Sequence, residues 1–392
     1  MKNNFLKLLK KTTKDPRDKI EKKIVFKICT IFSLTLIFFV LLNILISYTW
    51  RFYNDYKYQT NNPFPLHVRK AYTLNDQDQS ILHKNVHDLK FRYTPYLGAV
   101  PKNYSSKFVN FDESKGRKII NPNFCNKKAF FFGGSTTFGW LNEDDNTIPA
   151  LFKKKLGENL DKICVYNFGS PWLFSKQENI YLLNLIEKNN KPDYAIFIDG
   201  VNEACHGYNY SQNFKESFSE INVDHRTLIF NKKLKAIIRS LPMYQLADRL
   251  SGNIVNFKPD IDSDCDKNEK LEHLFYLRIK FRENLCNLNG VDCFTFLQPF
   301  GGVHGNIYPV SQDFQKDMLN KYNLLKKIST ENILYKKTEL EINKKVSVVD
   351  ISNVFNFDEQ IHYVDNVHYS NHANKLIADE IYRFFNENKK NK

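Results

Sequence analysis

The sequence predicts an α/β fold in which helices cover both faces of a parallel sheet. From about residue 124 to residue 392, short apolar runs of strand length alternate with longer stretches of helical period. Each apolar run ends in a polar or glycine-containing loop, as buried strands commonly do. Alternation of this kind is typical of a parallel sheet between two layers of helices.

Five apolar runs are predicted to be the strands of this sheet. They are 128–132, 163–168, 194–198, 292–297 and 346–351. The predicted helices are 148–160, 175–187, 271–288, 311–340 and 371–386. Between the third and fourth strands, residues of about 203–290 are too many for one crossover helix. This insertion is either a lid over the site or a decoration of the fold.

The N-terminal part predicts a membrane anchor. Residues 28–50 are almost entirely apolar, long enough to span a bilayer, and end in Tyr48 and Trp50, where an interfacial aromatic belt belongs. The alternative is a buried core helix, but a helix on the surface of a soluble protein would keep a polar stripe. No small-residue cleavage site follows, so the sequence favours an uncleaved anchor over a signal peptide.

Charge predicts the orientation of that anchor. Residues 1–27 carry ten Lys or Arg against Asp15, Asp18 and Glu21. This excess predicts a cytoplasmic tail, with everything beyond residue 51 in the periplasm or outside the cell. The whole chain has a net charge of +14, but no basic patch is interleaved with aromatics, so nucleic acid is not an expected partner. We interpret residues 51–123 as a stalk and entry segment and residues 124–392 as the main domain.

Six cysteines lie outside the predicted anchor, an even number that fits an oxidising compartment. Their spacing resembles no metal site, and six cysteines allow fifteen pairings. Two of them, Cys164 and Cys293, fall in predicted strands, where ordinary buried thiols are also common. The pairing stays open at this stage.

The most informative stretch is the end of the first strand, Phe130-Phe131-Phe132-Gly133-Gly134-Ser135. A buried strand that turns sharply at two glycines holds the following serine at the carboxyl edge of the sheet, where open α/β folds bind ligands. Ser135 is therefore a candidate nucleophile. Taken alone, the stretch favours a glycine-rich turn whose serine merely caps the next helix.

Three further strand ends carry polar residues of the kinds that hydrolytic chemistry uses. Gly169 follows the second strand, Asn202 and Glu203 follow the third, and Asp365 and His368 follow the fifth. Each has an ordinary structural explanation, such as a turn, a helix cap or a surface histidine. The occurrence of all of them at successive strand ends favours one shared site.

In this order, the four strand ends resemble the sequence blocks of the SGNH hydrolases, the GDSL-type esterase superfamily. The resemblance covers roughly residues 127–392 without the insertion. It implies a three-layer, flavodoxin-like α/β/α fold with a five-stranded parallel sheet, with Ser135, His368 and Asp365 as the catalytic triad. It departs from the common pattern at Gly134, where the Gly-Asp-Ser form has aspartate, and at Glu203, where aspartate commonly follows the asparagine.

The chemistry of such a site follows from the residue types. A serine hydroxyl needs an adjacent base, which His368 would supply, and an aspartate three residues before it would fix the histidine tautomer. The backbone N–H groups of Ser135 and Gly169 and the side-chain amide of Asn202 would form the oxyanion hole. The mechanism requires no cofactor. His206, His362 and His372 lack partners at zinc spacing, so no metal is expected.

We therefore expect a membrane-anchored serine esterase or O-acyltransferase acting on ester groups, with acetyl groups of cell-surface polysaccharide as the expected substrate. Two alternatives stay open. The fold could serve as a non-catalytic glycan-binding or scaffold module of an envelope assembly, or the chain could be a soluble lipase whose signal peptide is removed. A complete triad speaks against the binding module.

Overall fold

The computed structural model describes residues 16–60, 62–157, 162–206, 241–244, 271–306, 312–330, 335–337, 340–342, 346–356 and 358–390. The chain divides into two compact units. One comprises Met1–Tyr56 and Asn222–Lys258, and the other comprises Lys57–Ile221 and Pro259–Lys392. Most of the predicted insertion at 203–290 lies outside the described residues.

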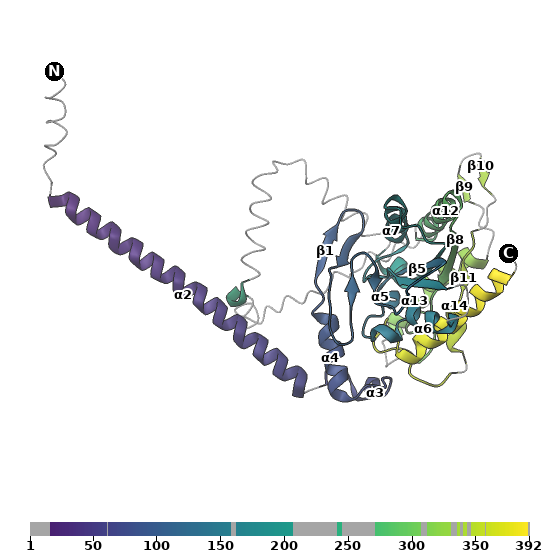
Figure 1. The fold of residues 1–392 in the computed structure, drawn as a ribbon, viewed down its shortest axis with the longest axis horizontal. Coiled ribbons are helices and arrows are strands. Elements are labelled where there is room, and N and C mark those ends of the chain that lie inside the picture. The colour runs from purple at the N-terminus through teal and green to yellow at the C-terminus, as the bar shows by residue number, and fades with distance from the viewer. Residues whose placement is uncertain are drawn as a thin grey trace, which may run out of the picture. The chain divides into compact units, whose positions relative to one another are not determined.

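The first unit is dominated by one long helix, α2 (Pro16–Thr60), drawn in purple in Figure 1. Its segment Lys23–Trp50 is long and apolar enough to cross a membrane. Large apolar side chains such as Phe32 and Phe38 are exposed along it. Such a helix fits a membrane span, because lipid, unlike water, can cover apolar side chains on every side.

Asn43 is the one strongly polar side chain in the middle of that span. Its amide nitrogen donates to Phe39 O (2.8 Å), and its oxygen accepts from the backbone N–H of Met243 (3.2 Å). Asn43 is only 8% exposed, in contrast to its apolar neighbours. The described piece of the insertion, 241–244, thus provides a hydrogen bond that an amide in an apolar helix requires.

The second unit is built on a seven-stranded sheet in the order β11-β8-β7-β5-β6-β4-β3. The strands are β3 (Phe111–Asp112), β4 (Gly116–Arg117), β5 (Lys127–Gly133), β6 (Ile163–Asn167), β7 (Tyr194–Asp199), β8 (Asp292–Leu297) and β11 (Val349–Asp350). Adjacent strands from β11 to β4 are parallel, and β3 alone is antiparallel to its neighbour.

The five predicted strands are confirmed, and their order is the flavodoxin-like order 2-1-3-4-5. The predicted strand count was too low. The entry segment adds β3 and β4 to the edge beside β6, because β4 pairs with Asn167 at the end of that strand. The fifth strand is also shorter than the predicted 346–351.

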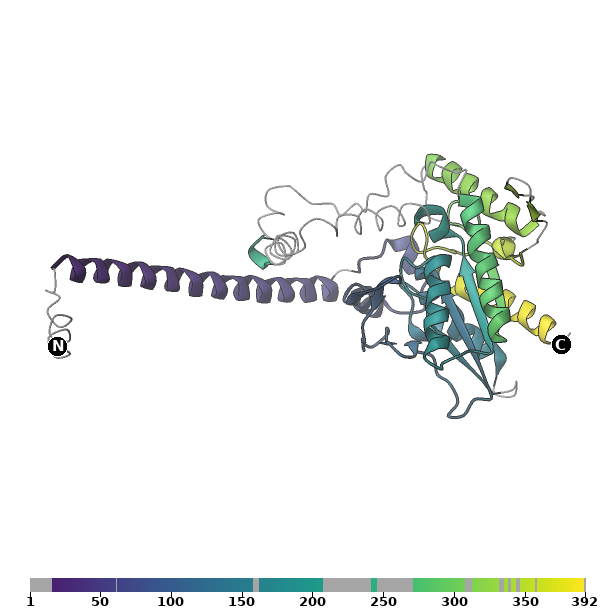
Figure 2. The same ribbon diagram turned by 90° about the horizontal axis from the view of Figure 1, so that it is seen from above.

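Helices cover both faces of the sheet (Figures 1 and 2). One layer contains α6 (Ile148–Leu156) and α14 (Asn371–Lys390); the other contains α7 (Ser175–Glu187) and α12 (Leu271–Asn289), with α13 (Gln312–Thr330) packed beside α12. Strand β5 serves both layers, because successive side chains of a strand point to opposite faces. Phe131 packs with Phe152 of α6, whereas Phe130 and Phe132 join the cluster that includes Leu182 of α7.

The predicted helix 311–340 was too long. Helix α13 ends at Thr330, and a small hairpin of β9 (Tyr335–Lys337) and β10 (Leu340–Ile342) follows. The residues where the helix stops, Ser329 and Thr330, compete for backbone hydrogen bonds and favour helix ends. The remaining short elements are α5 (Ser135–Phe138), η1 (Asp144–Asn146), α8 (Val201–His206) and η5 (Ser352–Phe355).

The predicted stalk, residues 51 to about 89, is instead packed into the second unit from about Asn62 onward, where it forms α3 (Leu66–Arg69) and α4 (Asp76–His87). The entry segment after it begins with the hairpin of β1 (Phe91–Thr94) and β2 (Gly98–Pro101). Leu82 and Val86 of α4 are fully buried, in one cluster with Phe138 and Val364. The stretch has few apolar residues, so its sequence does not show the period of an amphipathic helix clearly. Its buried apolar residues, Leu82 and Val86, are four positions apart and lie on one face of the helix.

Two disulfides join Cys125 to Cys164 and Cys286 to Cys293. Cys164 and Cys293 are therefore paired rather than free thiols. Cys164 lies at the beginning of β6 and Cys293 at the beginning of β8, so both disulfides lie at the amino-terminal edge of the sheet. Cys265 lies outside the described residues.

Candidate active site

The turn that carries Ser135 depends on two glycines. Strand β5 ends at Gly133, and α5 begins at Ser135. A Cβ at Gly133 would lie 2.0 Å from Thr137 Oγ1, and one at Gly134 would lie 2.1 Å from Asn202 Nδ2. A side chain at Gly133 would strike the turn that follows, and one at Gly134 would push the Asn202 amide aside. The absence of aspartate at 134 thus has a steric reason, because any residue there would displace Asn202.

The structure brings the three predicted triad residues together. His368 Nε2 lies 2.8 Å from Ser135 Oγ, and His368 Nδ1 lies 2.6 Å from Asp365 Oδ2. Because the carboxylate can only accept, Nδ1 carries a proton, and in the neutral ring Nε2 has its lone pair toward the serine hydroxyl. This is the arrangement that a serine nucleophile needs.

The loop that presents Asp365 and His368 is closed by its own atoms. Asp365 Oδ1 accepts from the N–H groups of Val367 (2.8 Å) and His368 (2.7 Å), and Val364 N donates to His368 O (2.9 Å). Desolvation of the carboxylate alone would raise its pKa. The attraction of His368 and these hydrogen bonds outweigh it, so the pKa of Asp365 is lowered and the group stays ionised.

The three expected oxyanion donors differ in their availability. Ser135 is the first residue of α5, where backbone N–H groups have no acceptor within the helix. One hydrogen of Asn202 Nδ2 is used by Leu173 O (2.6 Å), which leaves the second hydrogen for a ligand. The Gly169 N–H, by contrast, donates to Asn167 Oδ1 (3.0 Å).

Gly169 is required here for packing. A Cβ at this position would lie 2.6 Å from Phe138 N and 2.8 Å from Thr137 C, so the loop after β6 lies directly against the chain that follows Ser135. Glycine at 169 therefore allows the close contact between two loops of the site.

Sequence reasoning missed Arg117, which supports the nucleophile loop from β4. Its guanidinium is fully buried, donates to Asp144 Oδ1 (2.9 Å) and to the carbonyls of Phe138, Gly139 and Asn142 (2.7–3.1 Å), and lies over the Phe138 ring. Asp144, which lies in the acidic stretch Glu143-Asp144-Asp145, is buried as the partner of Arg117. No local signal in the sequence links these two residues, which are 27 positions apart.

Aromatic side chains lie beside His368 and on the loops next to the triad. The Trp140 ring lies 6.1 Å from the His368 ring, and the Tyr72 hydroxyl of the entry segment donates to Leu141 O (3.0 Å). Trp172 lies on the loop between Gly169 and α7 and is 49% exposed. Its φ of +67° is uncommon for a bulky residue and costs about 1–3 kcal/mol.

His304, which we had left without a role, has a structural one. Its Nδ1 accepts from Phe300 N (3.1 Å), its ring packs edge-on against Tyr322, and burial lowers its pKa to about 4. A neutral histidine that is used in this way belongs to the core.

Two groups among the described residues bring three potential metal ligands within 4.8 Å of one another. In the first, Asp358, His362 and His372, the lone pair of His362 Nδ1 accepts from Asn306 N (2.8 Å), so Nε2 of the neutral ring carries a proton and cannot bind a cation. In the second, Glu178, Asp199 and Glu203, the guanidinium of Arg282 already supplies the positive charge. Neither group suits a metal ion.

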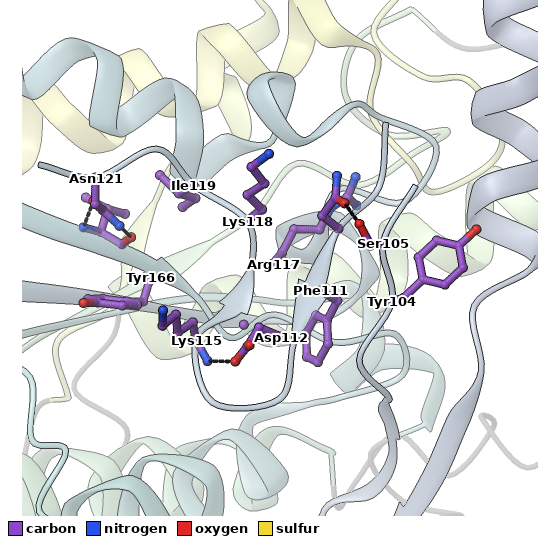
Figure 3. Close-up of a pocket in the computed structure, with 13 residues that line it drawn as sticks. Tyr104, Ser105, Phe111, Asp112, Lys115, Arg117, Lys118, Ile119, Asn121 and Tyr166 are labelled. Carbon is purple, nitrogen blue, oxygen red and sulfur yellow. Dashed lines mark hydrogen bonds between the residues drawn. The ribbon is translucent and has the colours of Figure 1, made fainter. Parts of the chain in front are cut away.

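A cavity of about 410 Å³ lies beside β3, β4 and β6 (Figure 3). Its polar side chains are largely used within the protein. Asn121 pairs with the backbone of Val165 in both directions, and Asn110 binds Asp144 and Ser105. Polar groups that already have partners within the protein contribute little to ligand recognition. The cavity is therefore a weaker candidate for a binding site than the triad.

No family model matches this chain, and no curated protein matches its sequence. Among solved structures, the chain is similar to the carbohydrate acetylesterase Est24 from Sinorhizobium meliloti, with 13% identity over 67% of this chain and 99% of that one, at a TM-score of 0.37. It is also similar to the acetylxylan esterase Axe2 from Geobacillus stearothermophilus, with 17% identity over 66% of this chain and 94% of that one, at 0.35.

A third similar structure is a protein described as lipolytic and of the G-D-S-L family, from Desulfitobacterium hafniense. The identity is 14% over 66% of this chain and 99% of that one, at a TM-score of 0.33. Identities and TM-scores this low do not define an activity, so the functional proposal below rests on side-chain geometry.

Proposed function

We propose that this protein is a membrane-anchored, SGNH-type serine esterase or O-acyltransferase whose active domain faces the periplasm or the cell exterior. The observation that carries the proposal is the unbroken path of hydrogen bonds from Asp365 through His368 to Ser135. The two contacts are 2.6 and 2.8 Å long, and the carboxylate fixes the histidine tautomer. In this tautomer the histidine can take the proton of the serine hydroxyl and so activate it.

The reaction follows the geometry. Ser135 Oγ attacks the ester carbonyl carbon while its proton passes to His368 Nε2, and the imidazolium is stabilised by Asp365. The negative charge that develops on the carbonyl oxygen is stabilised by the Ser135 N–H and by the free hydrogen of the Asn202 amide. Collapse of the tetrahedral intermediate breaks the bond to the alcohol, which takes the proton from His368 and leaves an acyl-enzyme.

The second half of the reaction decides between hydrolysis and transfer. Water or a sugar hydroxyl gives its proton to His368 and attacks the acyl-enzyme, and Ser135 is regenerated. We propose acetyl esters of cell-surface polysaccharide as the substrate, as the sequence resemblance implies. The exposed apolar surface of Lys23–Trp50 and the basic tail before it support a single-pass anchor in the cytoplasmic membrane with a cytoplasmic N-terminus.

The test uses the full-length protein in native membranes or detergent. Wild type, Ser135→Ala and His368→Gln are incubated with a fluorophosphonate probe and with a short-chain aryl ester. We expect labelling and turnover in the wild type alone, with a loss of about 10³-fold or more in each variant. Labelling of a folded Ser135→Ala variant would contradict Ser135 as the nucleophile. Absence of both signals from folded wild type would favour the non-catalytic binding module.

A further inference from the structure

The loop that carries Asn202 is held by a carboxylate that the proposed reaction does not use. Glu203, the next residue, lies at the beginning of α8 and is 1% exposed. One of its oxygens, Oε1, accepts from the backbone N–H of Ser175 (2.6 Å), and the other, Oε2, accepts from that of Gly200 (2.6 Å). A single side chain thus joins the loop after β6 to the loop after β7.

These are the two loops that meet beside the nucleophile. Asn202 Nδ2 donates to Leu173 O, two residues before Ser175, and also lies against Gly134. Asn202 and Glu203 therefore connect the same pair of loops through adjacent contacts. Displacement of either loop would move the amide that faces the reacting carbonyl, and a shift of about 1 Å in such a group can cost about a hundredfold in rate.

We propose that Glu203 is a positioning residue of the oxyanion hole, which holds Asn202 in place through the two acceptor oxygens of its ionised carboxylate. This inference rests on the proposed function. The reason lies in the bonding: both oxygens face N–H donors, and a carboxylate accepts strongly at both. A protonated carboxyl group accepts more weakly at its hydroxyl oxygen, and an amide presents a donor to one of the two N–H groups, so one contact is weakened or lost.

The surroundings make this ionisation costly. Glu203 faces Asp199 on β7, Glu178 on α7, and Arg278 and Arg282 on α12. The Arg282 guanidinium is directed to Asp199 Oδ2 (2.5 Å) and to Glu178 Oε2 (3.2 Å). Burial and the charge of Asp199 raise the pKa of Glu203 to about 7, against the hydrogen bonds from Ser175 and Gly200. Burial, with the charge of Asp199, raises the pKa of Glu178 well above its ordinary value.

The inference predicts an unusual pH dependence. Activity would require both a neutral His368 and an ionised Glu203, and protonation of either would reduce it. As the pH falls through about 7, protonation of Glu203 should lower kcat/KM in addition to the loss that the triad itself gives, so the acid limb should be steeper than a first-power limb. A triad without this additional carboxylate would show a first-power fall.

The experiment measures kcat and KM for an aryl ester against pH with the full-length wild type, Glu203→Gln, Glu203→Asp and Glu178→Gln. For Glu203→Gln we expect kcat lower by about tenfold to a hundredfold, a smaller change in KM, and a first-power acid limb. Glu203→Asp keeps the charge on a shorter side chain and should recover part of kcat. Glu178→Gln changes a neighbouring buried carboxyl that binds neither the Ser175 nor the Gly200 N–H, and it should keep the wild-type acid limb.

A folded Glu203→Gln variant with wild-type kcat and an unchanged acid limb would overturn the inference, as would a first-power limb in the wild type. If Glu203→Gln does not fold, the comparison of Glu203→Asp with wild type decides, since an aspartate that leaves kcat and the limb unchanged also contradicts it. Fluorophosphonate labelling of the wild type distinguishes a failure of this inference from a failure of the proposed function. Labelled wild type with unaffected Glu203 variants rejects only the positioning role, whereas unlabelled folded wild type rejects the proposed function.

Discussion

The two halves of the candidate triad are held in different ways. Asp365 and His368 are fixed by hydrogen bonds that span at most four residues, within a loop whose carboxylate is 43% exposed. The chain around Ser135 is fixed by buried partners that are distant in sequence. Arg117 donates to backbone carbonyls of the residues that follow Ser135. Thr136 Oγ1 donates to Gln298 Oε1 (2.8 Å), 162 positions away.

This difference separates a site element that a short motif encodes from one that the whole fold encodes. The aspartate-histidine half can form wherever its loop forms. The serine half exists only when β4, β5, β8 and the loop after β7 are assembled. Substitutions in the first half should therefore affect activity without affecting stability, whereas those in the second half should affect both.

The largest expected effect tests the local half. Asp365→Asn keeps the shape of the side chain but can present an amide to His368 Nδ1 and so favour the wrong tautomer. We expect kcat to fall by about 10⁴-fold, with a melting temperature close to that of the wild type, measured by aryl-ester turnover and thermal unfolding. A large drop in melting temperature would show that the loop is not locally determined.

Arg117→Met tests the fold-encoded half. It removes the cation beside the buried Asp144 and leaves three carbonyls without their donor, which should lower the free energy of unfolding by about 3–5 kcal/mol. Arg92→Met is the matched control, because Arg92 and Glu113 form a 2.8 Å ion pair with both side chains partly exposed. There we expect a change of less than about 1 kcal/mol in chemical denaturation. Equal effects would contradict the comparison.

Glu203→Gln should change how stability depends on pH. The folded-state pKa of Glu203, about 7, lies above the ordinary value of 4.5, so between these values the folded protein holds more protons on this group than the unfolded chain. Its contribution to stability is therefore present below about pH 4.5 and is lost as the pH rises through about 7.

Across that window, the wild type should lose about 3 kcal/mol relative to Glu203→Gln, by denaturant unfolding at each pH. Other groups titrate equally in both proteins, so their contribution cancels in the difference between the two free energies of unfolding. One such group is His83, because burial lowers its pKa to about 4. A constant difference from pH 4 to pH 8 would argue against the raised pKa.

The smallest effect concerns the strained residue on the serine side. Trp172→Gly and Trp172→Ala both remove the edge-on contact with Phe91, whose ring lies 5.3 Å away, but only glycine adopts a φ of +67° without strain. We expect the glycine variant to be more stable than the alanine variant by about 1 kcal/mol in thermal unfolding. Equal stabilities would indicate that the loop relaxes around the shorter side chain.

The same contrast explains what the sequence could predict. The five strands, the flavodoxin-like order implied by the resemblance, and the proximity of Ser135, Asp365 and His368 could all be inferred, because strand periodicity and a four-residue motif are local signals. Arg117 and Asp144 could not be inferred, since only assembly makes them neighbours. The sequence showed Glu203 as a departure from the common family pattern, which has aspartate there. Its contacts with Ser175 and Gly200 could not be inferred, because these residues lie on loops after different strands. Helix α4, in the predicted stalk, could not be inferred, because a single pair of buried apolar residues gives little periodic signal.

The two disulfides lie at the edge of the sheet opposite the triad. Because of this distance, the redox conditions that folding requires are independent of the conditions that turnover at the triad requires. Maturation has to take place where thiols are oxidised, and a chain held in a reducing cytosol would lack both covalent links between strand beginnings and their neighbours. Once the links are formed, the chemistry at the other edge involves no sulfur, so the redox state of the surroundings would act on the supply of folded protein and not on its turnover.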